Sequence, residues 1–98
     1  MLIVKVYHSN VHVATVRTPE TTVQEALEYA FRWTNNIHGS WSIPENPDYN
    51  DRVTVHAPLP VHDGRTFGLR SSMVGDTFIV DDTTYAVAIF GFQEVSDA

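Results

Sequence analysis

The sequence has 98 residues and no cysteine, which excludes a disulfide framework and thiolate metal sites and predicts one domain, residues 1–98. Hydrophobic residues make up 43% of the chain and charged residues 18%, which is typical of a globular protein and not of a disordered or coiled-coil one. The formal net charge of −6 argues against a general nucleic-acid binder, because such a protein presents a positive surface to phosphates.

The apolar stretches are short and unlike targeting segments. Leu2-Ile3-Val4 lacks a basic region before it and is followed at once by Lys5, so we expect no signal peptide. Stretches such as Ala86–Phe90 fall far short of the roughly 20 residues of a membrane helix. We therefore expect a cytoplasmic protein with no membrane partner.

The first seventeen residues predict a β-hairpin. Leu2–His8 and Val11–Arg17 are rich in β-branched residues that alternate with polar ones. Ser9-Asn10 between them is a natural turn dipeptide.

The next segment predicts an amphipathic helix. Thr22 and Glu25 form a capping-box pattern. From Val23 onward apolar residues, including Leu27 and Phe31, recur at helical spacing over about fourteen residues. We expect this stripe to face the hairpin.

The segment His38–Gly68 is irregular and holds four of the five prolines. Only Arg52–Ala57 alternates like a strand. Apolar side chains such as Trp41 and Tyr49 are too frequent for a free linker, so we expect an ordered loop that wraps the core. Such a long loop in a small domain is typical of a binding segment.

The last third predicts two strands, Thr77–Val80 and Thr84–Phe92, joined by a turn at Asp81–Thr83. Tyr85–Phe90 is apolar on both faces, which favours a central strand. The element order is β-β-α-β-β-β. It predicts an α+β fold, a mostly antiparallel sheet of about five strands with one helix packed on one face.

The five histidines are candidate metal ligands. His8 and His12 flank the first turn, and His56, His62 and Asp63 could add ligands from the loop. No pair has the helical spacing that fixes two ligands on one face. We therefore expect no metal site.

Catalytic motifs are equally weak. Ser71-Ser72 stand near Arg70 and Asp76, but no nucleophile elbow surrounds them. No glycine-rich phosphate loop occurs. We expect neither an enzyme nor a bound cofactor.

The most specific string runs from Phe67 to Asp76, FGLRSSMVGD, and is followed by a strand and a closing Phe-Gly-Phe. It resembles the C-terminal half of small uncharacterised proteins of bacteriophages and plasmids, notably of actinobacteria, which share an Arg-Ser-x-Ser-Val-Gly-Asp-like segment. Met73 stands where a serine is usual. The likeness covers residues 67–95. It implies an accessory protein of a mobile element and brings no activity or site residue.

Our leading hypothesis is that the chain is a protein-binding module of a phage or other mobile element. We extend this hypothesis to an inhibitor of a host defence or nuclease complex that has a basic surface. Acidic residues of the loop would steer that partner, and its aromatic and arginine side chains would anchor it. The competing interpretation makes Trp41 a core plug and the loop a cover. The expected binding residues are Trp41, Glu45, Asp48, Tyr49, Asp51 and Arg52.

Two alternatives stay open. One is a nucleic-acid-binding domain that uses Arg52, Arg65 and Arg70 with the loop aromatics. The other is a virion structural or assembly protein, in which the exposed edge of the first hairpin joins copies.

Overall fold

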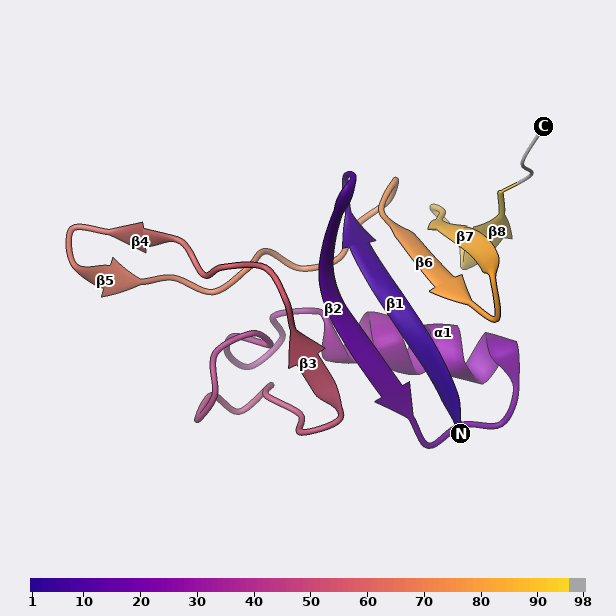
Figure 1. The fold of residues 1–98 in the computed structure, drawn as a ribbon, viewed down its shortest axis with the longest axis horizontal. Coiled ribbons are helices and arrows are strands. Elements are labelled where there is room, and N and C mark those ends of the chain that lie inside the picture. The colour runs from indigo at the N-terminus through magenta and orange to yellow at the C-terminus, as the bar shows by residue number, and fades with distance from the viewer. Residues whose placement is uncertain (96–98) are drawn as a thin grey trace.

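Residues 1–95, which the computed structural model describes, form one helix, a six-stranded antiparallel sheet and a separate two-stranded hairpin (Figure 1). The predicted α+β class is confirmed. In chain order the elements are β1 (Leu2–His8), β2 (Val11–Thr18), α1 (Val23–Trp33), β3 (Val53–Val55), β4 (Val61–His62), β5 (Arg65–Thr66), β6 (Thr77–Val80), β7 (Thr83–Val87) and β8 (Phe92–Glu94).

The large sheet has the strand order β3-β2-β1-β6-β7-β8, and each neighbouring pair is antiparallel. The predicted first hairpin is confirmed, and it lies in the middle of this sheet. The expectation that this hairpin has an exposed edge is wrong, because β1 also pairs with β6 and β2 also pairs with β3. Among residues 1–95, β3 and β8 are the outer strands of the sheet.

Local capping sets both ends of α1. The Thr22 hydroxyl oxygen accepts a hydrogen bond from the N–H of Glu25 at 3.2 Å and the hydroxyl donates to the Glu25 carboxylate at 2.7 Å, so Thr22 is the predicted N-cap. The helix has 11 residues, fewer than the predicted number. It ends early because the Thr34 hydroxyl donates back to the carbonyl of Ala30 at 2.7 Å.

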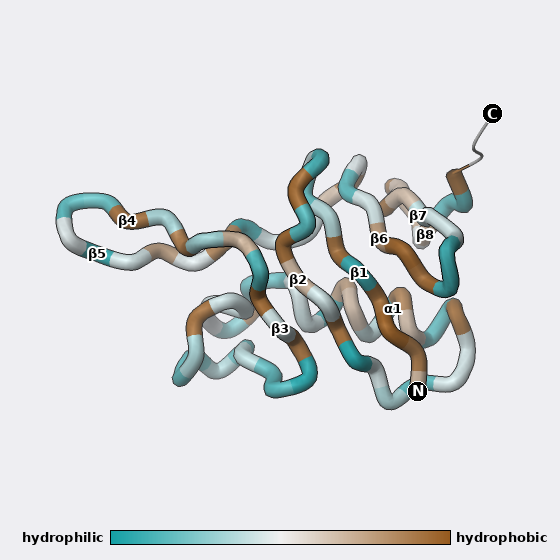
Figure 2. Tube along the Cα trace, viewed as in Figure 1, coloured by the Kyte–Doolittle hydropathy of each residue, from teal (hydrophilic) through white to brown (hydrophobic). Residues whose placement is uncertain are grey.

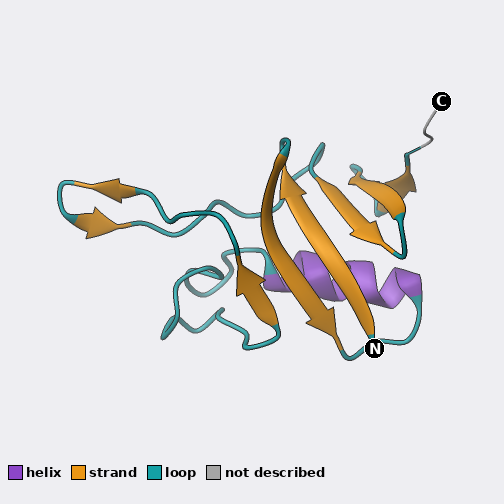
Figure 3. Ribbon diagram, in the orientation of Figure 1, coloured by secondary structure: helices purple, strands orange, loops and turns teal. Residues whose placement is uncertain are grey.

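The core lies between α1 and one face of the sheet (Figure 3). The buried side of the helix faces β1 and β2, as the apolar stripe predicts. Apolar stretches of the chain follow β1 and β6 (Figure 2), the two strands at the centre of the sheet. The fully buried apolar side chains of the sheet are Val4, Val6, Val16, Phe78 and Val80.

The predicted central strand over Tyr85–Phe90 does not form. β7 ends at Val87, and the N–H of Ala88 donates to the carbonyl of Gly91 at 2.9 Å to close a turn. Gly91 has a φ of +73°, which costs glycine little. The Phe90 side chain is 94% exposed in this turn. The turn separates β7 from the edge strand β8, and β1 takes the central place instead.

The irregular segment contains β3, where a strand was predicted, and a hairpin that was not. Among the described residues, β4 and β5 pair with each other alone. Asp63 and Gly64 join them with φ values of +51° and +75°, and the hairpin projects from the body as an arm (Figure 1). Asp-Gly is a hairpin signal, but strands of two residues are too short to show alternation.

Candidate functional site

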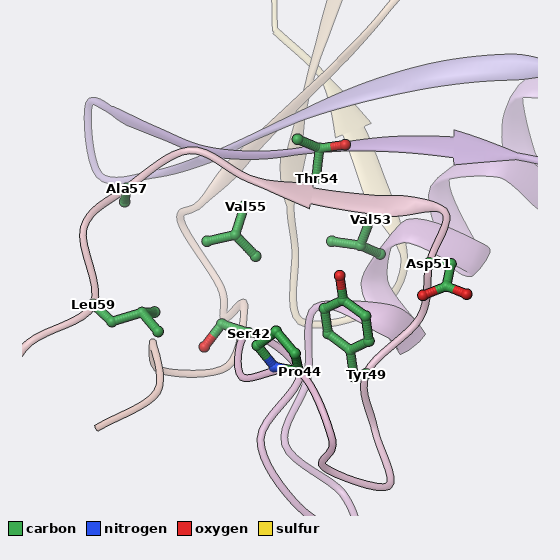
Figure 4. A pocket seen from close by; sticks show the side chains of 9 residues that line it. All are labelled: Ser42, Pro44, Tyr49, Asp51, Val53, Thr54, Val55, Ala57 and Leu59. Carbon is green, nitrogen blue, oxygen red and sulfur yellow. The ribbon is translucent and has the colours of Figure 1, made fainter. Parts of the chain in front are cut away.

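A groove of about 460 Å³ lies beneath the edge strand β3. Val53 and Val55 of β3 point toward Pro44 and Tyr49 of the preceding loop, while Thr54 points to the other face of the sheet (Figure 4). The groove combines apolar and polar side chains and is open to solvent along its length. Its lining residues are Ser42, Pro44, Tyr49, Asp51, Val53, Thr54, Val55, Ala57 and Leu59.

The backbone of β3 offers free pairing groups at this edge. The N–H of Arg17 donates to the carbonyl of Arg52, and the N–H of His56 donates to the carbonyl of Val13, each at 2.8 Å. In an antiparallel ladder these bonds recur at every second residue. The N–H and C=O groups of Val55 therefore point away from β2, toward the open side of the sheet.

The loop wall of the groove is held in place by a buried carboxylate. Asp48 accepts hydrogen bonds from the N–H groups of Ile37 at 2.6 Å, Gly39 at 2.9 Å and His38, and from Arg32 Nη2 at 3.0 Å. Burial opposes ionisation of this carboxyl, but the three backbone donors and the guanidinium outweigh it and hold the pKa of Asp48 well below its usual range. Asp48 thus fixes the loop against the end of the helix.

Trp41 is a core plug. Its side chain has no exposed surface, its Nε1–H donates to the carbonyl of Arg70 at 2.9 Å, and its ring meets His8 edge-on with the centroids 6.0 Å apart. The structure thus agrees with the interpretation in which Trp41 fills the core and the loop covers it. A partner cannot contact Trp41 unless the core opens.

The six expected binding residues therefore separate into two groups. Tyr49 and Asp51 line the groove, and Glu45 and Arg52 are exposed beside it. Trp41 and Asp48 are fully buried and belong to the scaffold. The expected acidic rim of three carboxylates is corrected to two, Glu45 and Asp51.

Sequence reasoning missed the apolar part of the groove. Val53 and Val55 were assigned to a strand, and their shared face could have been read from the alternation. Pro44 and Leu59 carried no such signal, because their positions depend on how the loop folds back under β3.

A second polar cluster lies at the far end of β1. His8 Nε2 is 2.9 Å from Ser72 Oγ and 3.9 Å from Asp76 Oδ2, and Ser72 Oγ is also 2.7 Å from Thr34 Oγ1. In a catalytic triad the carboxylate would bind Nδ1 and leave Nε2 to the serine; here one nitrogen faces both groups. His8, Ser72 and Thr34, all buried, tie the end of the helix to the sheet.

The arginines of the nucleic-acid alternative are not brought together. Arg70 forms a bidentate ion pair with Asp76, at 2.6 and 2.9 Å. Arg52 donates to the carbonyl of Arg17 at 3.4 Å beside β3, and Arg65 lies on the projecting arm. The pairing of Arg70 neutralises its charge, so the three do not form one cationic surface.

The five histidines do not gather into one cluster. His8 is buried on the helix side of the sheet, whereas His12 lies opposite Tyr7 on the outer face, so the pair across the first turn does not meet. His62 Nε2 lies 3.4 Å from Asp63 Oδ2 at the exposed tip of the arm. Within residues 1–95, histidines and carboxylates do not gather in any group of three or more that could hold a metal ion.

No protein-family model matches the chain, and no curated protein or solved structure is significantly similar to it. Within the described residues, none of the helical chain is long and apolar enough to cross a membrane. Function therefore has to be inferred from the geometry of the chain itself.

Proposed function

We propose that the protein is a protein-binding module that accepts an extended segment of its partner beside β3. The observation that carries this proposal is the groove of about 460 Å³ under β3, an outer strand of the sheet whose Val55 backbone groups point away from β2. Strand addition of this kind draws affinity from main-chain hydrogen bonds and specificity from pockets for alternate side chains.

The chemistry of the edge defines the segment it fits. A strand added beside β3 pairs with the N–H and C=O groups of Val55 and sends every second side chain into the groove. Apolar side chains suit the wall formed by Val55, Leu59 and Tyr49. The carboxylates of Glu45 and Asp51 favour a basic residue at the rim. The partner segment is thus extended, alternately apolar and basic.

The resemblance to phage and plasmid proteins suggests the setting. A small acidic module in a host cell would act in the cytoplasm by binding, with a host defence or nuclease complex as its target. Its net charge of −6 favours a basic partner surface. We propose a surface-specific inhibitor without catalysis or cofactor.

The test begins with a partner captured from host lysate and then measures its affinity for variants of the groove. Leu59→Glu places a charge in the groove, and Val55→Pro removes the outward N–H without removing a bond to β2. Tyr49→Ala and the double variant Glu45→Ala/Asp51→Ala test the wall and the rim. If Tyr49 anchors the segment, its loss weakens binding about 30-fold or more.

Phe90→Ala is the matched control, because Phe90 is an exposed apolar side chain on the β7–β8 turn, outside the groove. It should leave binding unchanged. Circular dichroism and melting temperature confirm that each variant folds. If the groove variants bind as well as the parent protein while Phe90→Ala does not, the docking surface is the β7–β8 hairpin and the proposal is lost.

A further inference from the structure

Two histidines from different strands meet on the outer face of the sheet. His12 belongs to β2, and His56 follows the last residue of β3. Their ring centroids are 4.6 Å apart, and the ring of Tyr7 stacks on His12 at 4.9 Å. The main chain fixes this proximity, because the N–H of His56 donates to the carbonyl of Val13 at 2.8 Å.

Both rings direct the same nitrogen to one atom. Thr15 Oγ1 is 3.2 Å from His12 Nε2 and 2.8 Å from His56 Nε2. A hydroxyl has one proton, so it donates to one ring and accepts an N–H from the other. At least one Nε2 therefore presents a lone pair to the shared point.

The surroundings of His12 disfavour its charged form. Partial burial, and then the charge of His56, lower the pKa of His12; a backbone hydrogen bond with Ala14 opposes this shift, and the positive charge of Lys5 adds to it. A neutral imidazole is a common ligand of transition metals. The two Nε2 atoms thus lie together beside Thr15 on a solvent-accessible face of the sheet.

We propose that His12 and His56 chelate one divalent transition-metal ion through their Nε2 atoms. Metal–imidazole bonds of roughly 2.0–2.1 Å require the rings to turn toward each other, around a point beside Thr15 Oγ1. Because residues 1–95 hold no group of three histidine or carboxylate ligands, water and the Thr15 hydroxyl complete the shell. Imidazole suits Cu(II), Ni(II) and Zn(II), and Cu(II) binds tightest among them.

The ion would join two strands. His12 is anchored in β2 and His56 lies at the end of the edge strand β3, so coordination adds a cross-link at one edge of the sheet. Binding to the folded state alone raises the melting temperature by mass action. This inference does not depend on the proposed partner groove.

The test uses the untagged full chain and CuCl₂. Titration followed by electron paramagnetic resonance should show one Cu(II) per chain with nitrogen coupling from two imidazoles. Either His12→Ala or His56→Ala should weaken binding about 10²-fold, because the second imidazole then no longer adds intramolecularly. His62→Ala is the control, since His62 is an exposed histidine on the arm, and it should bind as the parent does.

Melting curves without metal show whether each variant is folded, and His12→Gln and His56→Gln keep the side chains polar if an alanine variant unfolds. Added Cu(II) should raise the melting temperature of the parent and of His62→Ala, and not of the four variants at positions 12 and 56. Equal Cu(II) affinity in folded position-12 and position-56 variants would overturn the proposal. Absence of a specific Cu(II) signal in the parent would also overturn it, as would loss of that signal in His62→Ala.

Discussion

Arg70 and Asp76 form a bidentate ion pair across the turn that leads into β6, with Nη1–Oδ2 and Nη2–Oδ1 distances of 2.6 and 2.9 Å. The carboxylate also accepts the N–H groups of Ser9 at 3.2 Å and Met73 at 2.9 Å. Burial disfavours the Asp76 charge, but Arg70 and the backbone donors outweigh it and lower the pKa of this carboxyl. One side chain thus joins the first hairpin to the turn before β6.

Asp76→Ala should destabilise the protein by about 3 kcal/mol, because it leaves two backbone donors and a guanidinium without their acceptor. Urea unfolding measures the change. Asp63→Ala is the matched control, since the Asp63 side chain is 87% exposed on the arm; its effect should stay within about 0.5 kcal/mol. Equal effects of the two variants would contradict the role assigned to Asp76.

His8 should make stability depend on pH near neutrality. Burial lowers its pKa below 6.5; the charge of Asp76 opposes this shift and Arg70 adds to it. As the pH falls below 6.5, the unfolded chain therefore takes up a proton before the folded one does. Stability should be full above about pH 7 and fall below it, by at most about 1.4 kcal/mol per pH unit for this group.

His8→Gln keeps a nitrogen near Ser72 and cannot be protonated, so it should reduce this slope between pH 7 and 5. His12 has a lowered pKa as well, so the difference between parent and variant isolates the part due to His8. Asp48 and Asp76 have lowered pKa values, so their contributions to stability are lost below about pH 5, as the unfolded carboxyls titrate. An unchanged slope in His8→Gln would show that His8 is not buried in its neutral form.

Trp41→Phe should cost about 2 kcal/mol, because the carbonyl of Arg70 loses its donor and the smaller ring leaves space in the core. Chemical denaturation measures it. Trp33→Phe is the matched control. Trp33 is half-buried, and the centroid of its ring lies 4.1 Å from the guanidinium carbon of Arg32. This variant should lose only about 0.5–1 kcal/mol of unfolding free energy. A larger loss of stability in Trp33→Phe than in Trp41→Phe would contradict the burial of Trp41.

Leu27 and Phe31, two apolar side chains of α1, are buried to different extents. Leu27 is 1% exposed, so Leu27→Ala should cost about 3 kcal/mol. Phe31 is half-buried and packs near Phe78 and Phe92, with ring centroids 6.5 and 6.1 Å away. Phe31→Ala should therefore cost less than a fully buried phenylalanine, about 2 kcal/mol. Thermal melting of the two variants checks this order.

Local chemistry in the sequence determined the elements whose causes lie within a few residues. Ser9-Asn10 placed the first turn, Thr22 with Glu25 placed the start of α1, and Asp81-Asp82, with φ values of +47° and +66°, placed the turn between β6 and β7. In each case a side chain or a left-handed backbone residue acts on its own neighbours. These local signals can be read from the sequence without knowledge of the rest of the fold.

Tertiary structure alone decided the strand order, and with it the candidate sites. Whether β3 or the first hairpin forms an edge depends on pairing between segments more than thirty residues apart, which side-chain alternation does not encode. The same pairing brings His56 to His12, and loop packing buries Trp41, for which the sequence allowed both a surface and a core position, and Asp48, which was expected on a binding rim. Periodicity shows which residues share a face of one strand, but only the assembled sheet shows what lies across from them.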